Sequence, residues 1–389
     1  MKTDDCGFLQ NAVPAPRPPA LPESNSGVLR PVPISELGRD SSVEWVWEGY
    51  LSPNHITLLV GLWKSGKSTL LAHVLKLLCT GGELGGSVHP AKVLLLTEES
   101  EAIWADRRDE IGIGDSVHVI CRPFLRRPDF DEWRGLIGEL RRLVRDEGYK
   151  TVVFDPIPSL WPVTRENDAG QIVDALVPLQ GLAGAGTAIL LLHHPSKSDA
   201  TEGRASRGSG ALTGFVDVIL EFRRFDPERR EDRRRVLTAY SRFSETPDET
   251  VLELTDAGYV CCGTKADVKR TDRLAVITDL LPRCAPGLTV EEVLKVWPAG
   301  NTVPKPGLRT VRNDLQHAFG AGTFGRSGDG KKQSPYRFWV SDSIPASSVS
   351  YRAEPNSDRQ DGSAVADDDD SDRREREAIM SVEADAARK

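Results

Sequence analysis

The sequence predicts an α/β fold in which helices cover a mostly parallel β-sheet, with a smaller helical domain after it. From Trp45 to about Cys262, short runs of Leu and β-branched residues alternate with helical segments, which is typical of parallel strands joined by crossover helices. A glycine-rich loop of the phosphate-binding type joins one of these strands to one of these helices. After residue 263 the pattern changes to amphipathic helices followed by a glycine-rich hairpin.

The strand candidates are short apolar runs bounded by turn residues. They are His55–Val60, Lys92–Thr97, Val117–Cys121, Thr151–Asp155, Ala188–Leu192 and Val216–Phe222. Three later runs have no helices between them, which predicts an antiparallel edge on the parallel core. They are Val236–Tyr240, Val251–Leu254 and Tyr259–Cys262. Between the two groups, the charged segment Arg223–Arg235 is predicted to be a solvated hairpin tip, with a DNA or subunit contact as the alternative.

The glycine-rich loop has the sequence GLWKSGKST, which fits the pattern GxxxxGK[ST] at every fixed position. Glycines let backbone N–H groups turn toward phosphate oxygens, and the helix that follows adds its positive N-terminal end. Lys67 is expected to neutralise the β and γ phosphates of a nucleoside triphosphate, and Ser68 to hold Mg2+. The predicted ATP-binding residues are Gly61, Lys64, Ser65, Gly66, Lys67, Ser68 and Thr69.

Two acidic positions follow apolar strands and are candidates for metal binding and hydrolysis. Asp155 ends the strand TVVFD, and an acid there lies beside the phosphate loop in P-loop folds and holds Mg2+. Glu98 leaves another strand, where a carboxylate can orient and polarise the attacking water. The alternative for Glu98 and Glu99 is a pair of solvated loop acids.

Two adjacent histidines, His193 and His194, follow a further core strand. Zinc binding is disfavoured because neighbouring residues on a strand point to opposite faces and no third ligand is evident. We therefore expect one of them to sense the γ-phosphate by a hydrogen bond, and leave open which one. A histidine that is simply satisfied at a strand end is the alternative.

The last third of the chain predicts a winged helix-turn-helix. Three amphipathic helices are expected over Asp272–Leu281, Thr289–Trp297 and Gly307–Phe319, and the second opens with a capping box between Thr289 and Glu292. The segments 320–330 and 334–340 then form the wing. The third helix would read a major groove and the wing would meet phosphates, although such folds also bind proteins. The predicted DNA contacts are Arg309, Arg312, Asn313, Gln316, Lys331 and Lys332.

Charge and composition divide the chain further. The net charge of −8 argues against a uniformly basic surface, but residues 264–340 carry more Lys and Arg than Asp and Glu, and residues 341–389 carry the reverse. We expect a disordered Pro-rich leader over residues 1–43, an ATPase domain over 44–263, the winged helix over 264–340 and a disordered acidic tail over 341–389.

Targeting and metal-site signals are lacking in the sequence. Met1–Leu9 contains acidic residues and no apolar core of the signal-peptide type, no apolar run is long enough to span a bilayer, and the six cysteines show no zinc-ligand spacing. A cytoplasmic protein with reduced cysteines and no membrane partner is expected.

Taken together, GLWKSGKST, LLLTEES, VVFDPIPSL, ILLLHHPSK and RGSGALTGFVDVIL, in this order and spacing, resemble the RecA-like ATPases of the plasmid replicative helicase RepA group. These belong to the AAA family ATPases within the wider DnaB-like helicase superfamily. The resemblance covers about residues 44–262 and implies a RecA-like core with ATP and Mg2+ as cofactors. It implies that Lys67, Ser68 and Asp155 bind phosphate and metal, and that Glu98 is the catalytic base.

The resemblance also implies a ring of identical subunits, a hexamer being one option, in which an arginine reaches the ATP of its neighbour. Arg242 lies where the relatives carry a Lys-x-Arg pair, although Tyr240 takes the place of the Lys; Arg207 is the other candidate. Single-stranded DNA would pass through the ring, and the winged helix would contact duplex DNA. Two hypotheses follow: a translocating, DNA-stimulated ATPase, such as a replicative helicase of a plasmid or mobile element, and an ATP-switched DNA-binding regulator with little turnover.

Overall fold

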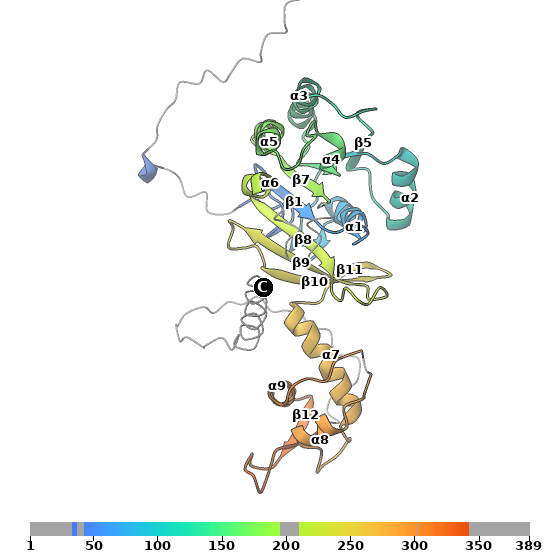
Figure 1. The fold of residues 1–389 in the computed structure, drawn as a ribbon, viewed down its shortest axis with the longest axis vertical. Helices are drawn as coiled ribbons and strands as arrows, with labels where there is room; N and C mark the ends of the chain where they lie inside the picture. The colour runs from blue at the N-terminus through green and yellow to red at the C-terminus, as the bar shows by residue number, and fades with distance from the viewer. Residues whose placement is uncertain (1–32, 37–42, 195–209, 301, 342–389) are drawn as a thin grey trace, which may run out of the picture. The chain divides into compact units, whose positions relative to one another are not determined.

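A nine-stranded sheet forms the centre of the protein in the computed structural model, which describes residues 33–36, 43–194, 210–300 and 302–341 (Figure 1). The strand order is β11-β10-β9-β8-β1-β7-β6-β4-β5. The strands are β1 (Ile56–Val60), β4 (Val93–Thr97), β5 (Val117–Cys121), β6 (Thr151–Asp155), β7 (Ala188–His193), β8 (Val218–Arg224), β9 (Arg234–Ser241), β10 (Glu249–Thr255) and β11 (Gly258–Cys261). The first six are parallel, and β9 to β11 add an antiparallel edge. The predicted α/β fold class is confirmed.

Helices cover both faces of this sheet because successive strand residues alternate between two apolar cores. Leu59, Leu95 and Val153 face a core shared with α1 (Lys67–Thr80) and with Trp104 of α2 (Glu101–Ile111). Leu58, Leu96 and their neighbours face the opposite core. That core is shared with α3 (Phe130–Glu147), α4 (Ile157–Leu160), α5 (Ala169–Ala183) and α6 (Gly210–Phe215). A small hairpin of β2 (Gly82–Glu83) and β3 (Ser87–Val88) follows α1.

The charged segment Arg223–Arg235 differs from its prediction as a solvated hairpin tip. Arg223 and Arg224 belong to β8, and Arg234 and Arg235 belong to β9, so that only the residues between the two strands form the turn. The aromatic ring of Phe225 is buried with Val236 and Val251, which ties the base of the hairpin to the sheet. The charged sequence therefore includes the end of β8 and the start of β9, next to buried residues.

Three helices and a two-stranded sheet follow the central sheet. They are α7 (Lys265–Leu280), α8 (Val290–Lys295), α9 (Leu308–Gly320), β12 (Phe324–Ser327) and β13 (Arg337–Val340). Their shared core includes Ile277, Val311 and Phe338. The predicted capping box of α8 is present, with the Thr289 hydroxyl accepting from the Glu292 backbone N–H and the Glu292 carboxylate accepting from the Thr289 N–H.

Helix α7 begins at Lys265, earlier than the predicted Asp272, because a second capping box opens it. Thr264 accepts a hydrogen bond from the backbone N–H of Asp267, and the Asp267 carboxylate accepts from the N–H of Thr264. Its first turns lie against the sheet, where Val268 joins the cluster of Phe225 and Val251.

Among the N-terminal residues that the structure describes, Ile34–Glu36 form a short 3-10 helix, η1. Most of the predicted leader, and the predicted acidic tail beyond Ser341, lie outside the described residues. In the described ranges no helix is long and apolar enough to cross a membrane.

Candidate nucleotide site

The candidate site lies at the edge of the sheet where the parallel strands end. Strand register places Val60 of β1 beside His193 of β7, and Thr97 of β4 beside Asp155 of β6. Because the carboxyl ends of parallel strands meet at one edge, four segments of distant sequence converge next to the phosphate loop. The sequence could predict this convergence, since each polar residue directly follows an apolar run.

The phosphate loop between β1 and α1 requires its glycines for two reasons. Gly66 has φ +99°, in the left-handed region that favours glycine, and Lys64 also has a positive φ of 59°. A Cβ at Gly61 would lie 2.5 Å from the carbonyl oxygen of Phe222 on β8, which is closer than real contacts allow. Ser65 is buried, and its hydroxyl has no hydrogen-bond partner among the described residues.

Lys67 is buried at the start of α1, and its ammonium group donates hydrogen bonds to the carbonyls of Gly61 and Leu62, the latter at 3.0 Å. Burial lowers its pKa to about 8, and the nearby Asp155 carboxylate acts in the opposite direction. Burying a lysine is costly. The loop carbonyls and Asp155 offset part of that cost, and Ser68 and Thr69 follow in the same first helical turn, half-buried.

Asp155 is buried at the end of β6, and its pKa is raised to about 7, mainly by burial and next by the charge of Glu99. Lys67 and Arg107 act in the opposite direction. A buried carboxylate with a raised pKa and neighbouring acids favours the approach of a cation. This environment fits the predicted role of Asp155 in holding Mg2+.

The two acids after β4 have different surroundings. Glu98 is exposed, and no ion pair of its carboxylate occurs among the described residues. Glu99 pairs through both oxygens with the guanidinium of Arg107 on α2, which also lies 4.7 Å from the ring of Trp104. Of the two, Glu98 is therefore the carboxylate without an ion pair among the described residues, and its role as catalytic base stays a prediction.

Burial is the main cause that lowers the pKa of both His193 and His194; the charge of His194 and then that of Lys67 lower the pKa of His193 further, and the charge of Lys67 does the same for His194. The pKa of both falls to about 4, so both rings are neutral near pH 7. His193 is buried, with its Nε2 3.8 Å from a carboxylate oxygen of Glu166. His194 has a buried Nδ1 without a hydrogen-bond partner among the described residues. A neutral imidazole with a free ring nitrogen can bond a phosphate oxygen or a water.

The structure does not bring Arg242 to the phosphate loop of its own chain. Arg242 follows β9, and Ser241 pairs with Val218 at the start of β8, so Arg242 lies at the opposite edge of the sheet. Its guanidinium is 3.6 Å from the carboxylate of Asp217 and is largely exposed. Arg207, the other candidate, lies outside the described residues.

Arg235 is the arginine that does reach the phosphate loop, and sequence reasoning missed it. Its Nε donates to the carbonyl oxygen of Ser65 at 2.9 Å. The hydroxyl of Tyr259 on β11 lies on the same side, 3.5 Å from where a Cβ on Gly66 would be. The sequence signal for Arg235 was the antiparallel pairing of β9 with β8, because this pairing places the first residues of β9 at the carboxyl edge.

The residues fit a nucleotide with Mg2+. The unpartnered Ser65 hydroxyl, the buried Lys67 and the glycines suit a phosphate chain, and Asp155 with the Ser68 hydroxyl supplies oxygen ligands. In the described ranges no group of three or more His, Cys, Asp or Glu side chains could hold a metal.

Residues 24–200 match a family model described as "AAA domain", and this match includes the phosphate loop, Glu98 and Asp155. One solved structure, "Crystal structure of the RadB recombinase", is similar over 54% of this chain and 91% of its own, with 18% identity and a TM-score of 0.38. No curated protein matches the chain. The family match covers the phosphate loop between β1 and α1, and the observed sheet is mostly parallel with helices on both faces, as expected of a P-loop domain.

Proposed function

We propose that this protein hydrolyses ATP and acts on DNA. The observation that carries the proposal is the convergence of Lys67, Asp155 and Glu98 at one edge of the sheet, around a phosphate loop with an unpartnered buried hydroxyl. Burial strengthens the interaction between Lys67 and Asp155, since an ammonium and a carboxylate interact more strongly away from water. A surface cluster of the same residues would favour weak ion binding only.

Each residue has one task in the proposed reaction. The loop backbone and Lys67 bind the β and γ phosphates of ATP, and Ser68 and Asp155 hold Mg2+, which neutralises charge on the phosphates when bound. Glu98, exposed beside the loop, accepts a proton from the attacking water and orients it. Neutral His193 or His194 donates a hydrogen bond that reports the γ-phosphate to the chain after β7.

The decisive experiment is steady-state ATP hydrolysis by the purified protein with and without single-stranded DNA. Lys67→Ala is expected to lower nucleotide affinity and turnover by at least about tenfold, because it removes a buried charge from the phosphates. Lys76→Ala on the same helix is the matched control. Unchanged nucleotide affinity in Lys67→Ala would show that the phosphate-loop assignment is wrong.

The DNA-acting part of the proposal draws on the resemblance to plasmid replicative helicases of the RepA group. In that scheme subunits form a ring, with a hexamer as one option, and single-stranded DNA passes through it while ATP is hydrolysed between neighbours. Strong stimulation of turnover by single strands would support this replicative role. ATP turnover that is the same with and without DNA would contradict this replicative role.

A second candidate function is an ATP-switched regulator that binds duplex DNA, and the region after β11 favours it. Three helices and a two-stranded sheet have the order expected of a winged helix, and α9 exposes Arg309, Arg312, Asn313 and Gln316. Asp314, between them in sequence, is buried and accepts two hydrogen bonds from Arg273 on α7, at 2.6 and 3.0 Å. The Arg273–Asp314 pair therefore holds one side of α9 against α7, and the polar side of α9 faces outward.

Arg309→Ala with Arg312→Ala tests this reading in a single double variant. Duplex affinity is expected to fall by roughly tenfold or more, with a shallower dependence on salt, while ATP turnover stays unchanged. Arg283→Ala, an arginine outside α9, is the control. If the double variant keeps both the affinity and the salt slope, the exposed side of α9 is not the DNA reader.

A further inference from the structure

The hairpin between β8 and β9 brings its base to the phosphate loop, and Arg235 makes the contact. Its guanidinium donates from Nε to the Ser65 carbonyl at 2.9 Å. From Nη1 it donates to two carbonyls of its own hairpin, Asp232 at 2.7 Å and Arg234 at 2.8 Å. One planar group is thus bonded to the loop on one side and to the hairpin on the other.

This contact fixes the direction of a peptide group in the phosphate loop. The carbonyl of Ser65 and the N–H of Gly66 belong to one planar trans peptide, in which the two groups point in opposite directions. Because Arg235 holds the Ser65 carbonyl, the Gly66 N–H must point away from Arg235. Gly66 has φ +99°, a region open to many backbone orientations for glycine, so an external contact is needed to select one.

We propose that Arg235 is a positioning residue for nucleotide binding, acting within its own subunit by orienting the Ser65–Gly66 peptide of the phosphate loop. The proposal rests on the ATP-binding function proposed above. It assigns a role in the same chain, in addition to any arginine that a neighbouring subunit supplies.

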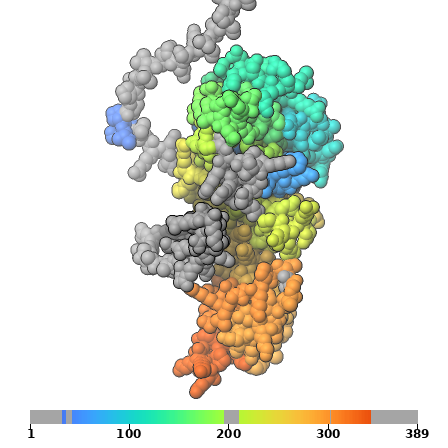
Figure 2. All heavy atoms as spheres, in the orientation of Figure 1, coloured from blue at the N-terminus to red at the C-terminus, as the bar shows by residue number. Residues whose placement is uncertain are grey.

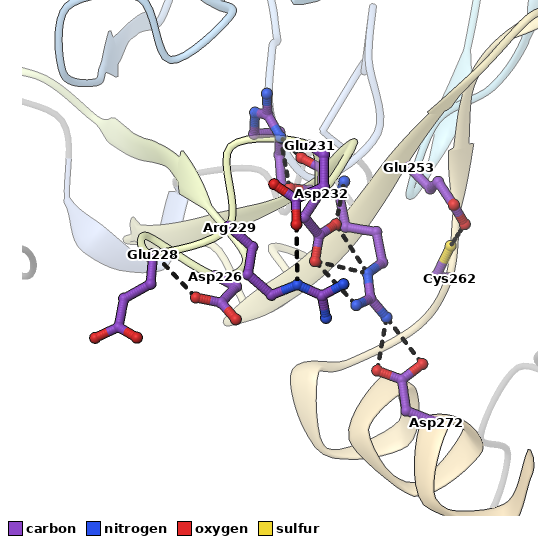
Figure 3. A network of polar contacts seen from close by, with 10 residues as sticks. Asp226, Glu228, Arg229, Glu231, Asp232, Glu253, Cys262 and Asp272 are labelled. Carbon is purple, nitrogen blue, oxygen red and sulfur yellow. Dashed lines mark hydrogen bonds and ion pairs between the residues drawn. The ribbon is translucent and has the colours of Figure 1, made fainter. Parts of the chain in front are cut away.

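The hairpin that carries Arg235 is itself braced, as the polar network in Figure 3 shows. Asp232 is nearly buried, and its carboxylate accepts from the backbone N–H of Arg234 at 2.8 Å and from its guanidinium at 2.9 Å. The same guanidinium donates to both oxygens of Asp272 on α7, at 2.8 and 2.9 Å (Figure 3). It also lies 4.3 Å from the ring of Phe225. The carbonyl of Asp232 that receives Arg235 is therefore held from several sides.

Nucleotide affinity in three variants tests the proposal, with a labelled ATP analogue as the probe. Arg235→Ala is expected to raise the Kd about tenfold, in the range for the loss of a charged hydrogen bond. Arg235→Lys keeps a charge on a single donor nitrogen, which cannot bridge the loop and the hairpin as the planar guanidinium does, so a smaller rise, about threefold, is expected. Arg233→Ala is the matched control, since Arg233 is an exposed neighbour whose partner Asp256 is almost fully exposed.

Two further readouts separate positioning from simple stability. A loop N–H binds phosphate in the ground and transition states alike, so Arg235→Ala should raise KM with kcat changed less than about twofold. The melting temperature should match that of Arg233→Ala within a few degrees. If Arg235→Ala and Arg233→Ala have the same Kd and KM, the positioning role is overturned. If the wild type itself binds no ATP analogue, the proposed function fails, and this inference with it.

Discussion

Arg235 near the start of β9 and Arg242 just after its end lie at opposite edges of the sheet. Arg235 is half-buried and bonded to the phosphate loop. Arg242 is largely exposed, and its ion-pair contact with Asp217 is long, at 3.6 Å. The antiparallel direction of β9 produces this separation. The strand starts beside the end of β8, at the carboxyl edge of the parallel strands, and ends beside the start of β8, at their amino edge.

The different exposure and hydrogen bonding of Arg235 and Arg242 indicate different roles. The half-buried guanidinium of Arg235, with three hydrogen bonds to carbonyls, holds backbone in place and has little freedom to approach a reacting phosphate. An exposed guanidinium is free to contact another molecule, and in its own subunit it is too far along the sheet to serve the phosphate loop. We therefore propose that the carboxyl edge binds nucleotide, and that the amino edge offers Arg242 to the site of a neighbour.

The largest expected effect is at the exposed end. Arg242→Ala should lower turnover by about 10³-fold if it acts in trans, because an arginine supplied to a phosphoryl-transfer site contributes at least that much. Stability should hardly change, since Arg242 is largely exposed and its contact with the Asp217 carboxylate is long, at 3.6 Å. Steady-state turnover and a thermal melt, with Arg233→Ala as control, measure both.

Mixing experiments sharpen this prediction. Subunits with Arg242→Ala and subunits with Glu98→Gln each lack one half of a shared site, so a mixed assembly contains some sites with both residues intact. Activity should reappear on mixing. No recovery, in a sample shown to exchange subunits, would contradict a site shared between subunits.

The next effect concerns the buried carboxylate at the carboxyl edge. The folded pKa of Asp155, about 7, is above its ordinary value of 3.8, so folding favours the protonated form. The resulting contribution to stability is complete below pH 3.8 and is lost as pH rises through about 7. Asp155→Asn should therefore be more stable than wild type at pH 8, by roughly 2–4 kcal/mol, with a gain that shrinks toward pH 4.

Denaturant unfolding in nucleotide-free buffer with a chelator checks this at several pH values. The Asn side chain resembles the protonated acid in shape, which makes it a suitable comparison. A gain in stability that is the same at pH 4.5 and pH 8 would refute the assigned burial cost. ATP turnover should be lost in the same variant, because the proposed metal ligand is removed.

Glu98→Gln should lower turnover by about 10²-fold and leave nucleotide affinity nearly unchanged, since a positioned base acts on the chemical step. Glu101→Gln, an exposed acid in the first turn of α2, is the control. Single-turnover hydrolysis and equilibrium binding separate the two quantities. If Glu99→Gln lowers turnover more than Glu98→Gln does, the paired acid and not the exposed one is the base.

The parallel core, and most of the residues at its carboxyl edge, could be predicted from the sequence. Each strand is a dense apolar run, and each candidate residue directly follows such a run. Lys67, Asp155 and His193 needed only their order in the chain and the rule that parallel strands end together. Arg235 could not be found in this way. Its role depends on β9 pairing with β8 within a charged run, and polarity alone assigns such a run to solvent.

The start of α7 could not be predicted from the periodicity of apolar residues either. The capping box of Thr264 and Asp267 starts the helix where the periodicity of apolar residues is still weak. Asp272 then lies within the helix and not at its start, which is what allows its carboxylate to meet Arg234. A local cap thus decided a contact between segments far apart in the sequence.

The smallest expected effect tests whether that contact supports the buried end of β9. Asp272→Asn removes one of the two carboxylates on Arg234 and leaves Asp232 in place, so the hairpin should loosen without opening. A partly exposed pair contributes under about 1 kcal/mol, and a rise of about twofold in the Kd for ATP is expected. Asp279→Asn, an exposed acid further along α7, is the control. Equal Kd values in the two variants would mean that Asp232 alone positions Arg235, and that α7 has no part in holding the phosphate loop.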